Sequence, residues 1–414
     1  MRLVVRGARA VTLAEGPIPR RGAALRELSV VDRADVVTSG GLIESVGPAG
    51  SARAEPGDTV IEAGGRVLMP GFVDCHTHLC SAGDRLDEWE RRLRGETYLD
   101  ILTAGGGIMS TVRAVREMDE AALADGLARR LVLALREGTT TVEVKSGYGL
   151  STVDELKMLR AIRAAAARFP GTVVSTALLG HAKDAAVADF VARTIGETLP
   201  AVRREFPASP VDAFCEAGAW SLDECARLFD AAMASGARVR VHADQFTPMG
   251  MTEWMIERSA ASALAVSVDH LEATAPAALR RLAGSRLFGV MLPCTGFHTD
   301  DRYGRGRDFI DAGGALAIAT NANPGSSPTW SAPLTIALAV RKLGLTPAEA
   351  IAACTVNAAA LLGAADRGVI APGKRADLVL LRHTDERMLA HHIGGNPVDA
   401  VIVGSAVVSG DGER

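Results

Sequence analysis

The sequence predicts a (β/α)8 barrel together with a smaller β-sandwich domain that both ends of the chain build. In the middle of the chain, eight short apolar runs alternate with helical stretches rich in Ala, Leu and Arg, an alternation typical of parallel sheets. Eight such units within about 300 residues fit a closed barrel better than an open sheet. Short strands separated by Gly and Pro occupy both ends instead, which indicates a separate β unit.

These patterns also place the domains and their elements. We expect a discontinuous β-sandwich from residues 1–68 and 368–414 and a barrel from residues 69–367. The sandwich strands are expected at 3–5, 10–13, 28–36, 42–46, 59–62, 67–69, 376–381, 400–403 and 406–409. The barrel strands are expected at 72–78, 139–145, 173–181, 211–216, 239–244, 267–272, 288–294 and 316–321. Helices are expected at 119–137, 152–168, 186–205, 221–235, 275–283 and 331–341.

Composition and charge restrict the class of protein. The 414 residues are 48% apolar and 23% charged, and the net charge of −4 leaves no basic surplus for binding nucleic acid. Six scattered cysteines without a Cys-x-x-Cys motif favour reduced thiols. The first residues show neither a signal peptide nor a membrane span. We therefore expect a cytoplasmic enzyme that acts on a small molecule and binds neither nucleic acid nor a membrane.

Residue types that bind metals follow the predicted barrel strands. Residues two apart on a strand point to the same face, so His76 and His78 would present two imidazoles side by side to one divalent metal. Five of the nine histidines fall at predicted strand ends, which is the edge where such barrels carry their active sites. These five are His76, His78, His181, His242 and His270.

This arrangement suits metal-assisted hydrolysis. A three-histidine site with an open position can bind water and lower its pKa towards ~7. A further residue must then move the water's proton to the leaving nitrogen. Taken singly, each histidine could instead be a hydrogen-bonded core residue. Glu143 and Glu216 are expected to be ion-pair partners of Lys145 or of arginines inside the barrel.

Longer motifs connect the chain with a known family. They are His-Thr-His at 76–78, Gly-Asp-Arg at 83–85, Tyr-Leu at 98–99, Gly-Gly-Gly-Ile at 105–108, Glu-Val-Lys-Ser-Gly-Tyr-Gly at 143–149, Asp-His-Leu-Glu at 269–272 and Asn-Pro-Gly-Ser at 323–326. With them the chain resembles the amidohydrolase superfamily and, within it, the imidazolonepropionase family. The resemblance covers nearly the whole chain. The histidine motif is shared across the superfamily, whereas the Lys-Ser-Gly-Tyr-Gly and Gly-Gly-Gly-Ile stretches are specific to the family.

The resemblance implies an activity and a set of site residues. The family hydrolyses the ring amide of 4-imidazolone-5-propanoate to N-formimino-L-glutamate in histidine degradation, uses one Zn or Fe ion, and implies a homodimer. The metal ligands it implies are His76, His78, His242 and the residue at 321. The catalytic positions it implies are Gln245, His270 and Asn321. The substrate-binding residues it implies are Arg85, Tyr148, His181, Gln245, Asn323, Gly325 and Ser326, with Arg85 holding the propanoate carboxylate. Backbone N–H groups of the 323–326 loop could also face an anion.

Two positions depart from the family pattern. Asn321 stands where the family carries Asp, and Gln245 stands where some members carry Glu. An amide oxygen can coordinate a metal, but an amide cannot act as a base, so the proton needs another carrier. The candidates are His270, His181 and Asp269. The loss of a negative ligand should also weaken metal affinity.

Three functions therefore remain open from the sequence. The first is an active imidazolonepropionase. The second is a related cyclic-amide hydrolase or deaminase with another small substrate, since the stretches after His181 and at 295–299 also depart from the family pattern. The third is a catalytically impaired homologue that binds a metal or ligand, which Asn321 favours. Arg85 and Tyr148 favour the first function because both suit a ring that bears a carboxylate.

Overall fold

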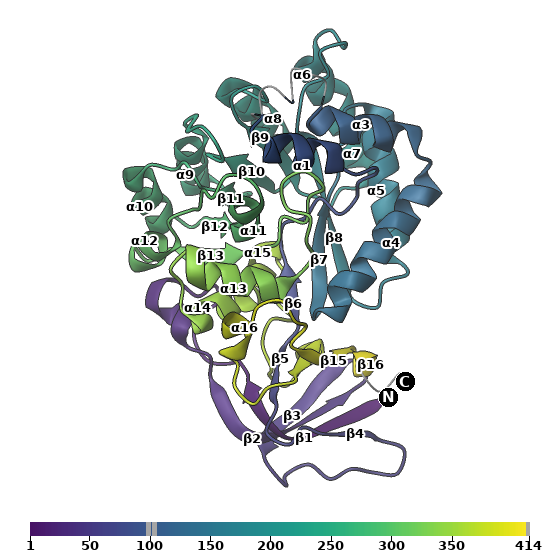
Figure 1. The fold of residues 1–414 in the computed structure, drawn as a ribbon, viewed down its shortest axis with the longest axis vertical. Helices are drawn as coiled ribbons and strands as arrows, with labels where there is room; N and C mark the ends of the chain where they lie inside the picture. The colour runs from purple at the N-terminus through teal and green to yellow at the C-terminus, as the bar shows by residue number, and fades with distance from the viewer. Residues whose placement is uncertain (97–100, 102–105, 411–414) are drawn as a thin grey trace.

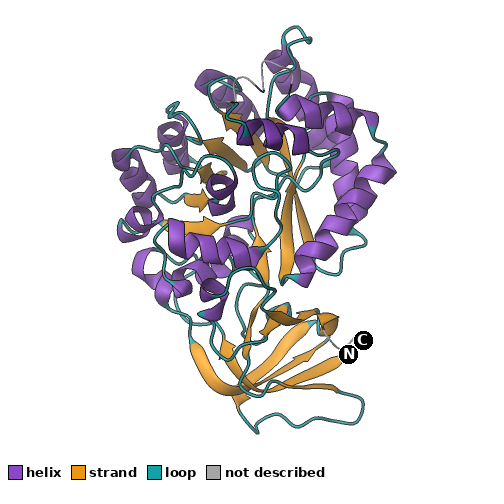
Figure 2. Cartoon of the chain, in the orientation of Figure 1, coloured by secondary structure: helices purple, strands orange, loops and turns teal. Residues whose placement is uncertain are grey.

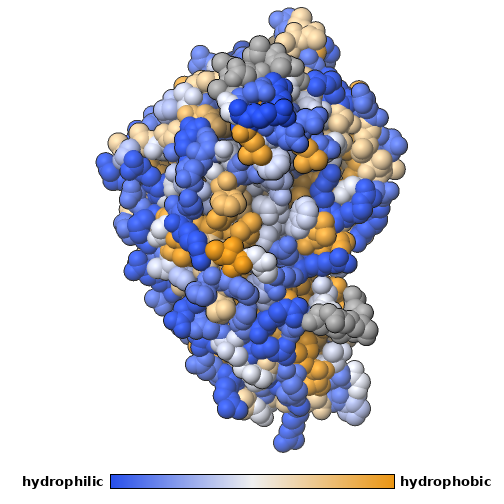
Figure 3. All heavy atoms as spheres, viewed as in Figure 1, coloured by the Kyte–Doolittle hydropathy of each residue, from blue (hydrophilic) through white to orange (hydrophobic). Residues whose placement is uncertain are grey.

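The protein consists of a helix-covered barrel with a β unit attached at one end (Figures 1 and 2). The computed structural model describes residues 1–96, 101 and 106–410. Tyr98, Leu99 and Gly105 of the motifs above therefore lie outside the described residues. On the face drawn in Figure 3, hydrophilic residues predominate and apolar ones gather in small separate patches. Across the described ranges, none of the helices combines the length and apolarity that crossing a membrane requires.

Eight strands form the barrel sheet, and each pairs in parallel with the next one along the chain. Neighbouring strands of the sheet are thus consecutive along the chain, which confirms the predicted (β/α)8 arrangement. Helices follow the strands and cover the outside of the barrel (Figure 2). The strands are β6 (Phe72–Asp74), β7 (Thr139–Lys145), β8 (Thr172–Gly180), β9 (Val211–Cys215), β10 (Val239–Ala243), β11 (Ala265–His270), β12 (Phe288–Met291) and β13 (Ala315–Ile318).

The first and last barrel strands meet through the residues that follow them. Thr320 donates from its backbone N and its Oγ1 to the Asp74 carboxylate, at 3.2 and 2.6 Å. Just beyond, the backbone N of Asn321 donates to the carbonyl oxygen of His76 at 3.1 Å. These contacts bring the loop after β13 against the loop after β6.

Three predicted strands extend too far at their C-terminal ends. The predicted strands 72–78, 288–294 and 316–321 end at Asp74, Met291 and Ile318, because ladder pairing stops there. Beyond Met291 the chain turns into a short helix that begins at Pro293, a residue well suited to a first helical turn. The polar residues expected on these strands therefore lie in loops.

Most predicted helices are confirmed within two residues at each end, and side chains cap several of them. Asp119, Ser151, Ser221 and Ser331 each accept a backbone N–H at the start of a helix, which satisfies a donor that the helix leaves unpaired. The helices are α1 (Leu86–Leu93), α3 (Ile108–Glu117), α4 (Glu120–Arg136), α5 (Thr152–Ala166), α6 (Phe190–Arg193), α7 (Leu199–Glu205), α8 (Leu222–Ala234), α9 (Met251–Ala261), α10 (Pro276–Gly284), α11 (Pro293–His298), α12 (Gly306–Asp311), α13 (Ala332–Lys342), α14 (Pro347–Ala353), α15 (Val356–Leu362) and α16 (Met388–His391).

The predicted helix at 186–205 is wrong as one continuous α-helix. The chain becomes helical only at Phe190, and a π-helical turn (Thr194–Thr198) separates α6 from α7. Pro200 stands at the start of α7 and has no N–H to donate to the preceding turn. The N–H of Leu199 reaches Thr194 O instead, which widens the helix by one residue.

Strands from both ends of the chain form one mixed sheet, which confirms the predicted β unit built by both termini. β5 pairs with β1 on one side and with β14 on the other, so it joins the two chain ends. The predicted strands 3–5 and 10–13 are one strand, with register shifts around Gly7 (φ +63°). The strands are β1 (Arg2–Val11), β2 (Val30–Ser39), β3 (Leu42–Pro48), β4 (Thr59–Glu62), β5 (Val67–Pro70), β14 (Leu378–Leu381), β15 (Val398–Val403) and β16 (Ala406–Gly410).

A single glycine links the two units at the start of the barrel. β5 ends at Pro70 and β6 begins at Phe72. A Cβ on Gly71 would lie 2.3 Å from Thr140 Oγ1 of β7, so only glycine allows the linker to pass this close. The linker thereby fixes the start of β6 and, through it, the position of the histidine loop.

Candidate metal centre and active-site cavity

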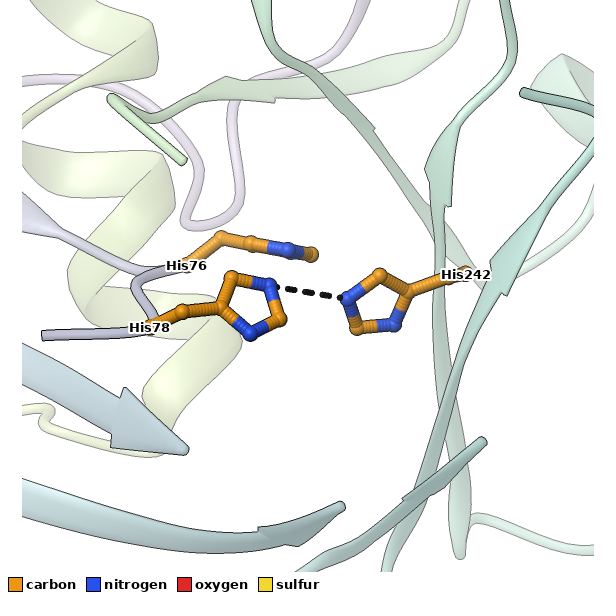
Figure 4. Close-up of side chains that lie close together, drawn as sticks. All are labelled: His76, His78 and His242. Carbon is orange, nitrogen blue, oxygen red and sulfur yellow. Dashed lines mark hydrogen bonds between the residues drawn. The ribbon is translucent and has the colours of Figure 1, made fainter. Parts of the chain in front are cut away.

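Three histidines converge at the C-terminal end of the barrel strands. His76 and His78 lie in the loop after β6, and His242 lies on β10 (Figure 4). One ring nitrogen from each lies within 4.8 Å of the others, and the Nε2 atoms of His78 and His242 are 3.3 Å apart. The expectation that His76 and His78 lie on a strand is wrong, yet their rings remain neighbours, with centroids 5.4 Å apart.

Two of these rings are hydrogen-bonded through Nδ1 to buried carboxylates. Asp269 Oδ2 lies 2.6 Å from His76 Nδ1, and Asp212 Oδ1 lies 3.0 Å from His242 Nδ1. A carboxylate at Nδ1 fixes the proton on that nitrogen and leaves the Nε2 lone pair free for a metal. Among the described residues, the buried Nε2 of His76 has no hydrogen-bond partner. Both features are those of metal-binding imidazoles.

A buried ionic network supports these carboxylates. Lys145 Nζ lies 2.8 Å from both Glu143 Oε1 and Asp212 Oδ2, and Arg240 Nη2 lies 2.6 Å from Asp269 Oδ2. The prediction that Glu143 pairs inside the barrel is thus confirmed. Three carboxylates face two cations, so the network carries excess negative charge beneath the histidines. That excess charge would help to balance a divalent cation.

The protonation of the cluster also suits a metal. Burial lowers the pKa of His76, His78 and His242, so all three rings stay neutral at pH 7. Burial opposes the ionisation of Asp212, but the Lys145 charge and the hydrogen bond from His242 outweigh it and keep the pKa of Asp212 well below its usual range. Metal binding needs neutral imidazoles and ionised carboxylates, and the site has both.

Asn321 lines the same cavity as His78 and His242 and offers an oxygen rather than a charge. Its Nδ2 donates to Thr295 Oγ1 at 2.8 Å and to Ser326 Oγ at 3.2 Å. Both amide hydrogens are thereby used, and within the described chain the buried Oδ1 has no partner. The residue adopts a left-handed conformation (φ +62°), which asparagine tolerates. Three imidazoles and one unpaired amide oxygen therefore fit one divalent metal ion.

Most of the predicted site residues line one cavity at this end of the barrel. Two do not: His76 and Tyr148 are buried behind its wall, and the Tyr148 ring lies 4.9 Å from the His181 ring. The predicted residues that line the cavity are His78, Arg85, His181, His242, Gln245, His270, Asn321, Asn323, Gly325 and Ser326.

The three candidates for moving a proton have different surroundings. His270 lines the cavity, has a strained backbone (φ +86°) and places Nδ1 3.3 Å from Glu272 Oε1. His181 also lines the cavity, but burial lowers its pKa to about 3. Asp269 accepts bonds from Ser267, Arg240 and His76 and is not among the lining residues.

Two predicted polar roles are wrong. Glu216 forms no ion pair among the described residues, because its carboxylate accepts the backbone N–H groups of Phe246 and Thr247 at 2.8 and 3.2 Å. The N–H groups of Gly325 and Ser326 do not present an anion site, because both donate to Asn323 Oδ1, at 2.8 and 3.3 Å. Asn323 thus shapes the loop through a local turn.

The stretch at 295–299 forms part of the cavity wall. Thr295 Oγ1 accepts from Asn321, and Thr299 lines the cavity directly. His298 Nε2 lies 3.2 Å from Arg92 Nη2. The departure of this stretch from the family pattern therefore falls on residues that touch the site.

Sequence reasoning missed two charged residues of the cavity, Glu88 and Arg92. Arg85 donates through Nη2 to Glu88, and Arg92 Nη2 donates to Gly325 O at 2.9 Å. Arg85 is the residue just before α1, and Arg92 follows it by seven residues, or about two helical turns, so both lie on the same side of the helix. This seven-residue spacing is visible in the sequence and could have indicated that Arg92 lies beside Arg85.

Known proteins share both the sequence and the fold of this chain. The pattern of the Amidohydrolase family matches residues 85–408. Imidazolonepropionase of Deinococcus radiodurans is 45% identical over 391 residues, which cover 94% of this chain and 96% of that protein. Imidazolonepropionase of Geobacillus kaustophilus is 40% identical over 94% of this chain and 93% of its own length. The chain therefore belongs to the amidohydrolase family and, within it, to the imidazolonepropionases.

Solved structures agree on the fold. The atrazine chlorohydrolase from Arthrobacter aurescens TC1, complexed with zinc, matches with a TM-score of 0.70 at 16% identity, over 99% of this chain and 95% of that one. N-isopropylammelide isopropylaminohydrolase from Burkholderia multivorans matches with a TM-score of 0.68 at 20% identity, over 100% and 99% of the two chains. At these identities the likeness concerns the fold alone.

Proposed function

We propose that this protein hydrolyses the ring amide of 4-imidazolone-5-propanoate to N-formimino-L-glutamate, a step of histidine degradation. The observation that carries the proposal is the cluster of His76, His78 and His242, two members of which, His78 and His242, line a cavity that also contains Arg85. The imidazolonepropionases that match nearly the whole chain are named for this substrate. In the reaction, water adds to the ring carbonyl carbon, the carbon–nitrogen bond breaks, and the leaving nitrogen takes a proton.

One divalent ion would be held by His76, His78 and His242, with Asn321 Oδ1 as a further ligand. Three imidazoles and an oxygen suit zinc or iron. When bound, such an ion supplies a Lewis acid that lowers the pKa of water and polarises a carbonyl. All four proposed ligands are neutral, so the nearest balancing charge is that of Asp212 and Asp269 behind the rings.

Arg85 is the proposed anchor for the propanoate carboxylate, because a guanidinium fork matches a carboxylate. His181 donates its Nδ1 proton to Gly147 O at 3.0 Å, which leaves Nε2 to accept a hydrogen bond from the ring. Tyr148 supports His181 from behind in this scheme. Gln245 contacts the reacting centre, and Asn323, Gly325 and Ser326 form the wall beside it.

His270 is the proposed carrier of the proton. Asn321 and Gln245 are amides and cannot accept it, and a histidine with a pKa of about 3, such as His181, is a poor base at neutral pH. His270 lines the cavity and has the Glu272 carboxylate at its Nδ1. This pairing places the ring proton on Nδ1, so that Nε2 can accept the water's proton. The protonated ring can then polarise the carbonyl and pass the proton to the leaving nitrogen.

The test is turnover of 4-imidazolone-5-propanoate by purified protein of measured metal content, beside Asn321→Asp. Asn396→Asp makes the same charge change in an exposed residue and serves as the control. Turnover by the native protein with little gain from Asn321→Asp supports the proposal and an imidazole proton carrier. Metal binding without turnover until Asn321→Asp restores it would show an impaired homologue instead.

A second candidate function rests on the stretch at 295–299, where the sequence departs from its family and where Thr299 lines the cavity. It is hydrolysis or deamination of another small cyclic amide. If neither the native protein nor Asn321→Asp acts on imidazolone-propanoate while metal is bound, this candidate replaces the first. A screen of cyclic amides and amino-heterocycles would then identify the substrate.

The proposal includes a compartment and an assembly. The six cysteines are all buried and unpaired, which supports the reducing cytoplasm. A homodimer is implied by the family resemblance. Sedimentation of the purified protein tests the dimer, and cell fractionation tests the compartment.

A further inference from the structure

The cavity beside the histidine cluster carries an uneven charge. Among the described residues that line it, two arginines, Arg85 and Arg92, face one carboxylate, Glu88. The wall therefore has one positive charge that no carboxylate of the lining balances. Such a wall attracts an anion.

The single carboxylate is already engaged. Glu88 accepts from Arg85 Nη2 through one oxygen, and its other oxygen accepts the backbone N–H of Gly107 at 2.9 Å. The Arg85 side chain is 9% exposed, and its remaining contact is a long one of 3.5 Å from Nη1 to Thr111 Oγ1. Part of the Arg85 guanidinium group is thus already hydrogen-bonded within the protein when no ligand is bound.

Arg92 lies at the same point of the cavity. Its Nη2 is 2.9 Å from Gly325 O, while the position of a Cβ on Gly325 would be 2.9 Å from Arg85 Nη1. The two guanidinium groups therefore flank one residue. Within the described chain, Arg92 makes side-chain hydrogen bonds only through Nη2, to Gly325 O and His298 Nε2, which leaves Nη1 and Nε available to a ligand.

The electrostatics agree with this placement. Burial, and then the charge of Arg85, lower the pKa of Arg92. A half-buried guanidinium beside a second one is held at a cost that a bound anion would offset. The neighbouring Arg94 differs, because it is exposed and pairs with Glu90 at 2.9 Å.

We infer that Arg92 is a second anchor for the substrate carboxylate and that Arg85 and Arg92 grip it together across Gly325. This inference rests on the proposed function and names a specificity residue for it. Arg85 alone would leave the carboxylate in competition with Glu88, whereas Arg92 offers unpaired donors. The two arginines would select ligands whose ring bears a carboxylate over neutral ligands of the same shape, because a neutral ligand leaves the buried positive charge uncompensated.

The test is calorimetric binding of imidazole-4-propanoate and of its neutral amide, imidazole-4-propanamide, to metal-loaded protein. Neither ligand has the ring carbonyl that is hydrolysed, so binding is read without turnover. We expect Arg92→Met to weaken the propanoate about 10- to 100-fold and to leave the propanamide unchanged, as for a lost charge-assisted pair. The matched variant Arg94→Met should change neither affinity.

The outcomes separate this inference from the proposed function. Equal weakening of both ligands would show that Arg92 only holds the Gly325 loop, and an unchanged propanoate affinity would show that it does not touch the carboxylate; either result overturns the inference. If Arg92→Met does not fold, Arg92→Lys keeps the charge without the fork and should weaken the propanoate alone. Selective propanoate binding without imidazolone turnover would refute the proposed function and leave the two-arginine anchor standing.

Discussion

Asp212→Asn is the substitution that most directly probes the network behind the histidines. Asp212 is fully buried and joins two side chains, with Oδ2 2.8 Å from Lys145 Nζ and Oδ1 3.0 Å from His242 Nδ1. An amide cannot carry the charge that Lys145 faces, and it can replace at most one of the two hydrogen bonds without strain. Lys145 would keep only Glu143 as a counter-ion.

The size of the effect follows from this geometry. Removing one partner of a buried ion pair costs about 3–5 kcal/mol, and Lys145 keeps one carboxylate, so we expect a loss of about 3 kcal/mol in the free energy of unfolding. Loss of the acceptor at His242 Nδ1 should weaken metal binding by about 10–100-fold. The removal of one negative charge from beneath the metal acts in the same direction.

Two measurements on the same variant check these values. Urea unfolding of the metal-free protein gives the stability change, and competition with a chelating dye gives the metal affinity. Asp230→Asn, at an exposed pair with Arg258, is the control and should leave both unchanged. A stability loss under 1 kcal/mol together with native metal affinity would refute the role assigned to the network.

Two further predictions concern the cavity and its pH dependence. Gly325→Ala should raise KM for imidazolone-propanoate about tenfold with little loss of stability, because the new Cβ would lie 2.9 Å from Arg85 Nη1 and displace that flexible group. The control is Gly284→Ala, because a Cβ at Gly284 would meet only open space. Equal KM values in the two variants would contradict the claim. For pH, burial lowers the pKa of His181 to about 3 in the folded protein, against about 6.5 in an unfolded chain. Between these values only the unfolded chain binds the proton, so falling pH destabilises the fold by about 1.4 kcal/mol per pH unit for this residue. Unfolding free energies of metal-free native protein and His181→Asn from pH 6.5 to 4 should show a smaller slope in the variant, and identical slopes would reject the assignment.

The strand ends show how far sequence patterns reach. The apolar runs located all eight barrel strands, and the histidines after them meet in one place because parallel strands end at one edge. The pattern could not show that β6 stops at Asp74, because ladder pairing, not apolarity, ends that strand. His76 and His78 still face one another because their loop is bonded to the loop after β13.

Charged residues at a distance in sequence were harder to predict. The roles of Asp212 and Asp269 depend on strands β9 to β11 lying side by side, which places each carboxylate behind a histidine of another segment. Arg92 and Glu88 lie in a run of charges that looks like an exposed helix surface. Only the packing of α1 against the loop of Gly325 turns that run towards the cavity.

The most direct test of the account is the position of the metal in crystals of the native protein, read from anomalous scattering at the zinc and iron absorption edges. We expect one full-occupancy peak within coordinating distance of His76, His78 and His242, with the Asn321 oxygen beside it. A fully loaded metal at another place, or no peak at the three histidines in protein soaked with zinc or iron, would contradict the central claim.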